Sequence, residues 1–266
     1  AEIRIWVAEG VANGMRPWFT KFSGVLYDKR WLDTVSDIYQ VLYRNEKYLR
    51  NIAPVARVGL VFSELSRNYG TESWQQRSSD HSSGMYHALL EARIPFEMVN
   101  DRLLSQEYLK PFRLLILPNI STLSDKQCKQ LKEFSESGGN ILATFETSLY
   151  DEEGNRRADF GLADLFGISY AEGVEGPMKN SYLKLKKDTE TNKYHPVLAG
   201  LEDSYRIINT IYRVKVKPVK DFPSLLTLIP TYPDLPMEHV YPRNEDTGIR
   251  ELYLRETGNS RIVYFP

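Results

Sequence analysis

Four short runs of apolar residues in the middle of the chain constrain its fold more than any other feature. Continuous apolar runs of this length are typical of strands buried on both faces, as in parallel sheets that helices cover on each side. The strands are predicted at Val58–Phe62, Phe96–Val99, Leu114–Leu117 and Asn140–Phe145, and the helices between them at Asp80–Arg93 and Ser124–Ser137. Ser124 and Gln127 have the spacing of a helix capping box. This alternation predicts an α/β fold, a flavodoxin-like three-layer sandwich from Arg57 to about Gly167.

The pattern after this sandwich changes to a period of two. Val214, Val216 and Val219 lie among lysines, and further alternating runs are separated by turns rich in proline and glycine. Those runs are Leu225–Ile229, Ile249–Leu254 and Arg261–Phe265. A period of two is typical of strands with one buried and one solvent-facing side. We therefore expect antiparallel strands that extend or cap the parallel sheet.

The segment before the sandwich predicts a different architecture. Ala1–Ala12 has helical spacing and stops at Asn13-Gly14, a good helix C-cap. Met15–Phe22 is strand-like, and Arg30–Tyr48 has the spacing of a long amphipathic helix. Helix, strand, helix is the repeating unit of an α/β barrel, although one unit cannot close a barrel. Because neither end has a polar tail, we expect the chain to be a fragment of a longer protein.

Composition and charge exclude several classes of function. The 266 residues include 34 basic and 35 acidic side chains, so no net field attracts nucleic acid or an anionic membrane. No apolar run approaches the roughly 20 residues that span a bilayer. The glycine motifs that bind nucleotides are missing, and His81 and His87 are too far apart to share one helix face as metal ligands. We expect no cofactor, no metal, no nucleic acid and no membrane as partners.

Related α/β enzymes place a cysteine or serine nucleophile on a sharp turn at the end of a central strand. The corresponding turn, Leu117–Ser121, contains no cysteine and no flanking glycine. Ser121 is therefore a poor candidate for a nucleophile. The single cysteine, Cys128, falls in the middle of a predicted helix, where we expect it to be inert. Thiol acyl-transfer chemistry is not expected.

Three residues remain as candidates to bind a substrate. Trp18 and Lys21 lie on the strand-like segment, whose carboxyl end would face the mouth of a barrel, and tryptophan stacks well on sugar rings. The alternative is a barrel core residue and a surface lysine. Glu146 follows the fourth strand, at the edge of the sheet where open α/β folds bind ligands. The alternative for Glu146 is a hydrogen bond within the loop.

Stretches along nearly the whole chain resemble one family in the order that the family has them. The matching stretches are Ala12–Gly24, Asn45–Asn51, Ala56–Ser63, Phe112–Asn119, Gly138–Gly154, Phe160–Tyr170, Thr231–Arg243 and Arg261–Pro266. The family is that of bacterial glycoside hydrolases in which a catalytic α/β barrel is followed by a β-galactosidase-type trimerisation domain. That domain is similar to class I glutamine amidotransferases.

The resemblance implies a division of the chain and a function. Residues 1–53 would be the last helix–strand–helix of the catalytic barrel, and residues 54–266 the trimerisation-like domain. The two catalytic carboxylates of such enzymes would lie upstream of Ala1, so no catalytic residue is assigned here. The chain would then be a non-catalytic portion that oligomerises as a homotrimer and helps wall the site of a neighbouring subunit. The carbohydrate substrate would bind through the missing barrel, and we expect this chain to be inactive alone. The alternatives are a self-contained hydrolase or amidotransferase-like enzyme with an unrecognised nucleophile, and a carbohydrate-binding module.

Overall fold

The protein divides into two units, Ala1–Val55 and Ala56–Pro266. The computed structural model describes residues 2–20, 22, 24–50, 53–69, 78–231, 236, 239 and 247–266. Each unit is described by itself. Lys21 and most of the stretch 231–243 lie outside the described residues.

The first unit is a pair of helices. They are α1 (Glu2–Ala12) and α2 (Leu32–Arg44), followed by a 3₁₀ turn at Glu46–Tyr48. An ion pair of 2.8 Å between Arg4 Nη2 and Asp37 Oδ2 joins the two helices. Gly14 ends α1 with a φ of +86°, which a left-handed C-cap requires. The connecting residues lie against α2, where the Tyr39 hydroxyl donates to the Pro17 carbonyl over 3.0 Å.

The strand predicted at Met15–Phe22 is not formed in its described residues, which are irregular. A strand is stabilised by the hydrogen-bond ladder of a neighbouring strand. The described part of the first unit contains no other strand to supply that ladder. The two helices predicted on either side of the segment are confirmed, the second one shorter than Arg30–Tyr48.

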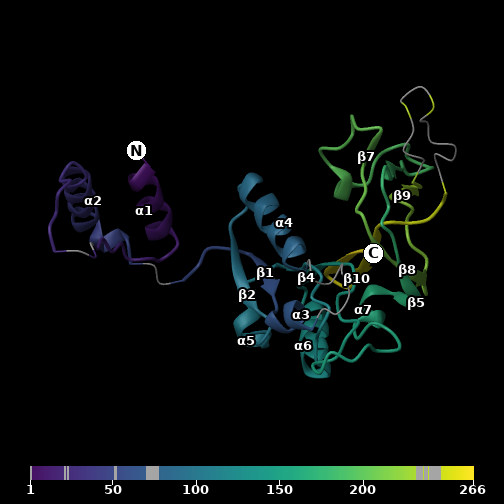
Figure 1. Ribbon diagram of the computed structural model, residues 1–266. Helices are drawn as coiled ribbons and strands as arrows, with labels where there is room; N and C mark the ends of the chain where they lie inside the picture. Colours follow the sequence, from purple (N-terminus) through teal and green to yellow (C-terminus); the bar gives the residue numbers. More distant parts are fainter. Residues whose placement is uncertain are drawn as a thin grey trace. The chain divides into compact units, whose positions relative to one another are not determined.

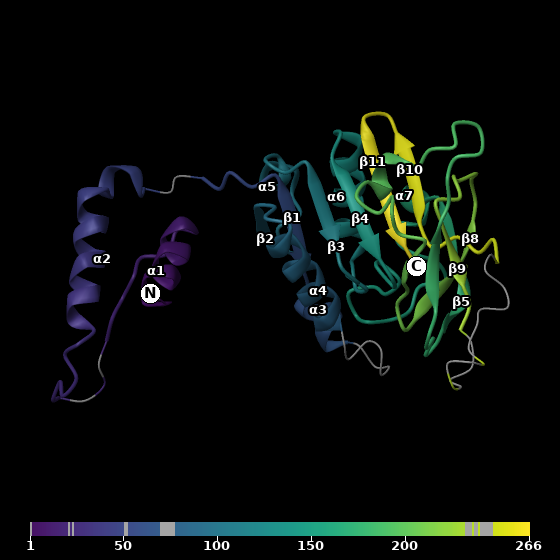
Figure 2. The ribbon, with the colours of Figure 1, turned by 90° about the horizontal axis from the view of Figure 1, so that it is seen from above.

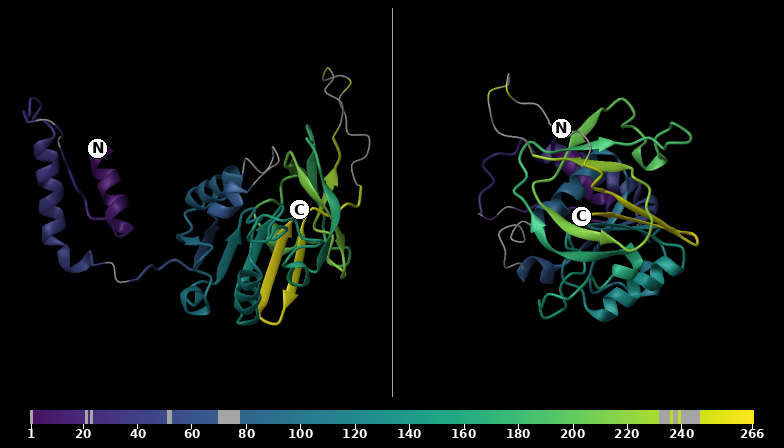
Figure 3. Two further views of the ribbon diagram at one scale, coloured as in Figure 1. Left: turned by 60° about the horizontal axis from the view of Figure 1, so that its bottom comes forward. Right: turned by 90° about the vertical axis from the view of Figure 1, so that its right-hand side faces the viewer.

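The second unit is built on a six-stranded sheet with the order β10-β11-β4-β3-β1-β2 (Figure 1). The strands are β1 (Val58–Phe62), β2 (Phe96–Asn100), β3 (Leu114–Leu117), β4 (Asn140–Thr144), β10 (Tyr253–Thr257) and β11 (Ser260–Phe265). Five of them are parallel, and β10 pairs antiparallel with β11. Figure 3 shows these last two strands, in yellow, as a hairpin beside β4. The four strands predicted between residues 58 and 145 are confirmed.

Helices cover both faces of this sheet, as the sandwich prediction requires. They are α3 (Glu64–Asn68), α4 (Ser78–Glu91), α5 (Gln106–Leu109), α6 (Asp125–Glu136) and α7 (Ala163–Phe166). In Figure 1, α4 lies above the strands and α6 below them. Alternation along the strands explains the two layers, since Leu60 packs with Leu89 of α4 whereas Val61 belongs to the cluster that includes Leu131 of α6. The predicted capping box is present, with Ser124 Oγ accepting from the Gln127 amide.

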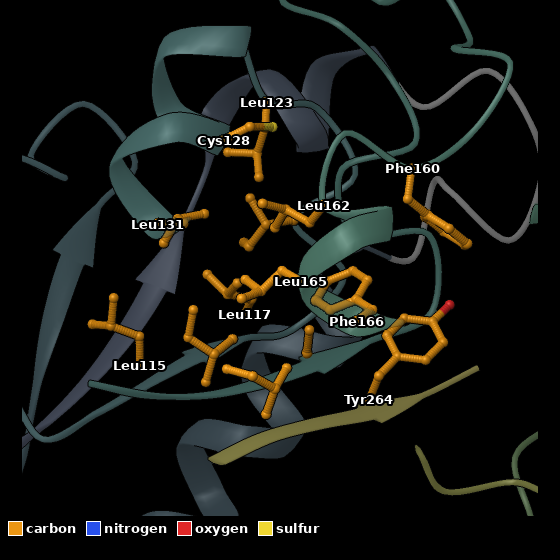
Figure 4. Packing of buried hydrophobic residues seen from close by; sticks show 14 of the residues in the cluster. Leu115, Leu117, Leu123, Cys128, Leu131, Phe160, Leu162, Leu165, Phe166 and Tyr264 are labelled. Atoms are coloured by element: carbon orange, nitrogen blue, oxygen red, sulfur yellow. The ribbon is translucent and has the colours of Figure 1, made fainter. Parts of the chain in front are cut away.

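The larger core cluster lies on the α6 face of the sheet (Figure 4). Leu115, Leu117, Leu131 and Phe166 fill it together with Tyr264 of β11. The Phe166 and Tyr264 rings are stacked with their centroids 4.9 Å apart. The Tyr264 hydroxyl is satisfied because it donates to a backbone carbonyl at the end of β4.

Two small antiparallel sheets complete the second unit (Figure 2). One pairs β5 (Ile168–Glu175) with β8 (Arg213–Pro218), and the other has the order β7-β6-β9, with strands at Arg206–Ile208, Tyr182–Leu185 and Leu226–Ile229. Leu183 and Leu185 of β6 pack with Leu254 of β10. The expected antiparallel pairing is confirmed: β10 and β11 form an antiparallel hairpin that extends the main sheet, although β11 itself runs parallel to β4. The other strands form antiparallel sheets of their own. None of the described helices is both long enough and apolar enough to span a bilayer.

Candidate functional site

The carboxyl edge of the parallel sheet is the candidate site, because the loops that follow β1, β3 and β4 meet there. Three residues that are not glycine adopt a left-handed backbone in these loops: Asn119, Phe145 and Ser148 have φ values of +52°, +54° and +69°. Such conformations cost about 1–3 kcal/mol each and persist only where the surroundings hold them. The loops at this edge are therefore held in a defined conformation by the residues around them.

Hydrogen bonds between the two loops hold this conformation. The backbone N–H of Asn119 donates to Thr144 Oγ1 over 3.0 Å, and Thr147 Oγ1 donates to the Leu117 carbonyl over 3.1 Å. The Ser148 amide donates to the Ile120 carbonyl over 2.9 Å. Because each bond joins the end of β3 to the end of β4, the two turns form one rigid edge.

Glu146 lies inside this edge. It is 2% exposed, and the Tyr150 hydroxyl donates to its Oε1 over 3.4 Å. Burial raises the pKa of the Tyr264 phenol, and the negative charge of Glu146 adds to that shift. Its place at the carboxyl edge is the one anticipated from the sequence, whereas its contact with a substrate stays a prediction.

Trp18 lies in the first unit with 79% of its surface exposed. Lys21, the second candidate from that segment, lies outside the described residues. Trp18 and Glu146 belong to different units, each described by itself. The structure therefore unites none of the three candidates in one described site.

The two nucleophiles weighed from the sequence are poorly placed for chemistry. Cys128 is buried in α6, and burial raises the pKa of its thiol to about 11. A thiol with that pKa is protonated at neutral pH and is a weak nucleophile. Ser121 is buried too, in the interlocked turn after β3.

A crevice at the ends of β1 and β3 was missed by sequence reasoning. We name it the β1/β3 crevice; its volume is about 270 Å³, and its lining includes Phe62, Ser63, Ser66, Ser82, Ser83 and Asn119. Asn119 is 1% exposed, and neither Nδ2 nor Oδ1 has a hydrogen-bond partner among the described residues. The turn itself is visible in the sequence, where Asn119 follows Pro118 at the end of the apolar run Leu114–Leu117.

The sequence did not predict an ion-pair cluster formed by Arg213, Glu175 and Glu251, of which Arg213 and Glu251 are buried. Arg213 of β8 contacts Glu175 Oε2 of β5 at 2.7 Å and Glu251 Oε1 at 3.1 Å. Glu251 is 3% exposed, and burial raises the pKa of its carboxyl to about 7; Arg213 opposes the shift and Glu175 adds to it. Glu251 and His81 line a pocket of about 200 Å³, which we name the β4/β11 pocket.

His81 in that pocket is stacked on Phe145, with ring centroids 5.4 Å apart. Burial lowers the pKa of its imidazole, and the nearby Asp80 charge opposes that shift. His81 and Glu251 thus line one pocket, each with a pKa shifted by burial. Within the described residues, no three histidine, cysteine or acidic side chains gather as metal ligands would.

Residues 56–200 match a family model described as the β-galactosidase trimerisation domain. A comparison with curated protein sequences finds no match. The fold is similar to that of a β-galactosidase from Bacillus circulans sp. alkalophilus, with 14% identity, a TM-score of 0.70, and 99% of this chain and 38% of that chain covered. A β-galactosidase from Rahnella sp. R3 gives 16% identity, a TM-score of 0.68, and coverages of 98% and 38%.

An α-L-fucosidase isoenzyme 2 from Paenibacillus thiaminolyticus has the same fold, with 17% identity, a TM-score of 0.62, and 99% of this chain and 37% of that chain covered. The chain thus spans less than two fifths of the length of these structures.

Proposed function

The chain belongs to the β-galactosidase trimerisation domain family, and on that premise we propose that it is the non-catalytic, trimer-forming and substrate-walling portion of a glycoside hydrolase that acts on carbohydrate. The observation that carries the proposal is the family match over residues 56–200, which fall within the second unit. Residues 54–266 are then the trimerisation-like domain, and residues 1–53 the end of a catalytic barrel.

The surface of the first unit supports its assignment to a larger domain. Among its described residues only Val7, Val35 and Ile38 form a buried apolar core. Many large apolar side chains are exposed instead: Ile5, Trp6, Trp18, Phe22, Tyr27, Val41, Tyr43 and Tyr48. An apolar surface of this extent is uncommon on a finished domain and marks a contact with further protein. The missing part of a barrel is the contact that we propose.

The catalytic chemistry would come from that missing part. Glycoside hydrolysis needs a pair of carboxyl groups on either side of the scissile bond. We assign no such pair within this chain, and the protonated thiol of Cys128 gives no substitute. In this arrangement Trp18 is the proposed stacking residue for the sugar, with Lys21 beside it in the sequence. Glu146, being buried, would support the edge of the wall from within.

Two exposed apolar surfaces of the second unit suit a cyclic trimer, in which each protomer uses two different surfaces. The α4–β2 surface consists of exposed Tyr86, Leu90, Ile94 and Met98. Its parts lie together, since the Tyr86 ring on α4 packs edge-on against Phe96 of β2 at 5.2 Å between centroids. It includes β2, which is the edge strand of the main sheet among the described residues, and an edge strand offers unpaired backbone groups to a partner.

The β7 surface is the second one. Tyr205, Ile208 and Ile211 are exposed there, Ile208 to 83%. β7 is the edge strand of its sheet, which packs through β6 on β10, at the opposite edge of the main sheet from β2. We propose that the α4–β2 surface of one protomer packs on the β7 surface of the next.

A mixing experiment tests this pairing. Leu90→Glu disables one surface and Ile208→Glu the other, so each variant alone is expected to sediment as a monomer. Mixed together they keep one intact pair of surfaces and are expected to form a one-to-one dimer. Val219→Glu, which changes an exposed apolar residue outside both surfaces, is the control and should leave the trimer intact. Trimers of both variants, or a mixture that stays monomeric, would contradict the pairing.

A self-contained hydrolase is the second candidate, and one observation favours it. The β4/β11 pocket is lined by Glu251, whose carboxyl group has a pKa of about 7, and by His81, whose imidazole has a lowered pKa. The test is turnover of nitrophenyl glycosides or of glutamine by the 266-residue chain. Turnover that Glu251→Gln abolishes would replace the first proposal with this one.

A further inference from the structure

The β1/β3 crevice lies at the position where the chain changes its direction of travel through the sheet. From β1 the chain moves outward to β2, and then returns to place β3 on the other side of β1. The loops after β1 and β3 therefore leave in opposite directions and open a gap between them. In open α/β sheets this point, at the carboxyl ends of the strands, is where ligands bind.

The Asn119 side chain is the second observation. It is 1% exposed, it lines the crevice, and both its amide nitrogen and its amide oxygen lack a partner in the part of the chain that the structure describes. Leaving a buried amide unsatisfied costs free energy, so such groups call for a partner from outside the chain. The left-handed φ of +52° at Asn119 adds backbone strain. A hydrogen bond from the Asn119 backbone N–H to Thr144 Oγ1 stabilises this conformation.

Two serine hydroxyl groups that line the crevice with Asn119 each accept a hydrogen bond from a backbone N–H. Ser63 Oγ accepts from the Ser66 amide over 3.1 Å, and Ser66 Oγ accepts from the Thr122 amide over 3.1 Å. With the oxygens used as acceptors, each hydroxyl proton can be given to another group. The crevice thus offers several donors, and Asn119 adds one further donor and an acceptor.

The charges around the crevice favour a neutral ligand. Glu64 and Arg67, both exposed on α3, line it together and offset one another. A ligand with no donor, such as a carboxylate, would leave Asn119 Oδ1 unsatisfied, and one with no acceptor, such as an ammonium ion, would leave Asn119 Nδ2 unsatisfied. A ligand hydroxyl both donates and accepts, so it satisfies both ends of the amide. The volume of about 270 Å³ is at the small end for ligand pockets.

We propose that the β1/β3 crevice is a binding site for a neutral, polyhydroxylated ligand of monosaccharide size, with Asn119 as its specificity-determining residue. The side-chain amide of Asn119 hydrogen-bonds to two hydroxyl groups of the ligand. The serines donate to other ligand oxygens, and Phe62 contacts the apolar face of the sugar ring. None of the residues that define the two trimer surfaces lines the crevice, and Asn119→Gly changes neither surface, so this variant separates the failure of the site from the failure of the trimer.

Binding of D-galactose and of D-glucose to the 266-residue chain, followed by saturation-transfer difference NMR, tests the proposal. We expect saturable binding of at least one of them, weakened about tenfold or more by Asn119→Gly. Glycine accepts the left-handed backbone and removes the unsatisfied amide, so this variant should melt no lower than the wild type. Asn180→Gly is the matched control, because Asn180 has a φ of +55° and is exposed outside the crevice.

Ser83→Leu is a second variant, which fills the crevice from an exposed position on α4 and leaves Asn119 in place. It should weaken binding as strongly, whereas the control should stay within about twofold of the wild type. Three results would overturn the proposal: no saturable binding of either sugar up to about 100 mM, affinity unchanged by both crevice variants, or tighter binding of inorganic phosphate or L-glutamine than of the sugars.

Discussion

The buried carboxyl group of Glu251 gives a sharp prediction for stability against pH. Its pKa is about 7 in the folded protein and 4.5 in an unfolded chain, so between these values the folded state holds a proton that the unfolded state has released. Stability from this group is therefore fully present below pH 4.5 and is lost as the pH rises through 7. The difference between the two pKa values corresponds to about 3 kcal/mol.

Glu251→Gln isolates this contribution, because glutamine has no proton to release. We expect the free energy of unfolding of the wild type, relative to the variant, to fall by about 3 kcal/mol between pH 4 and pH 8. His81 acts in the opposite direction, since its lowered pKa makes stability rise with pH, but it is present in both proteins and cancels. Arg213, the ion-pair partner of Glu251, is also present in both the wild type and the variant.

Urea denaturation followed by circular dichroism, at one fixed protein concentration, measures the difference at each pH. Glu256→Gln is the control: Glu256 is exposed and paired with Arg261 over 3.1 Å, and it should change stability by less than about 1 kcal/mol at every pH. A wild type and Glu251→Gln variant with parallel pH profiles, or a relative stability that rises with pH, would refute the reasoning about burial.

Three further predictions concern the second unit. A Cβ at Gly139 would collide with the Phe134 ring, so Gly139→Ala should lower the free energy of unfolding by about 1–3 kcal/mol in urea melts. Gly84→Ala on α4, with open space around it, should raise that free energy by about 0.5–1 kcal/mol. Cys128, with its pKa raised to about 11, should resist a thiol-specific reagent at pH 8 and react on unfolding; fast reaction of the native protein would contradict its burial. Tyr264→Phe leaves a buried carbonyl without its donor and should cost about 1–3 kcal/mol by the same melts, so an unchanged stability would argue against that hydrogen bond.

The strands of the parallel sheet could be predicted because each is marked by a short run of consecutive apolar residues in the sequence. A strand buried on both faces needs an apolar residue at nearly every position, as in Val58–Phe62 and Leu114–Leu117. The capping box at Ser124 is local in the same way. The resemblance to the trimerisation-domain family, made on stretches of residues rather than on periodicity, is confirmed by the family match.

The residues that define the two pockets could not be predicted, since their environment depends on contacts between distant parts of the chain. The raised pKa of Glu251 comes from its burial and from Glu175, which lies 76 positions earlier in the sequence and is joined to the same Arg213. Asn119 looks like an ordinary turn residue until β1 and β3 are seen side by side. The strand expected around Trp18 fails for the same reason, because a strand is defined by a neighbour.

Sedimentation equilibrium of the wild-type chain tests the central claim most directly. At protein concentrations in the range of about 1–100 μM we predict self-association to a species of three times the 30.8 kDa mass of one chain. A single species of 30.8 kDa at every concentration would contradict the account of this chain as a trimer-forming portion.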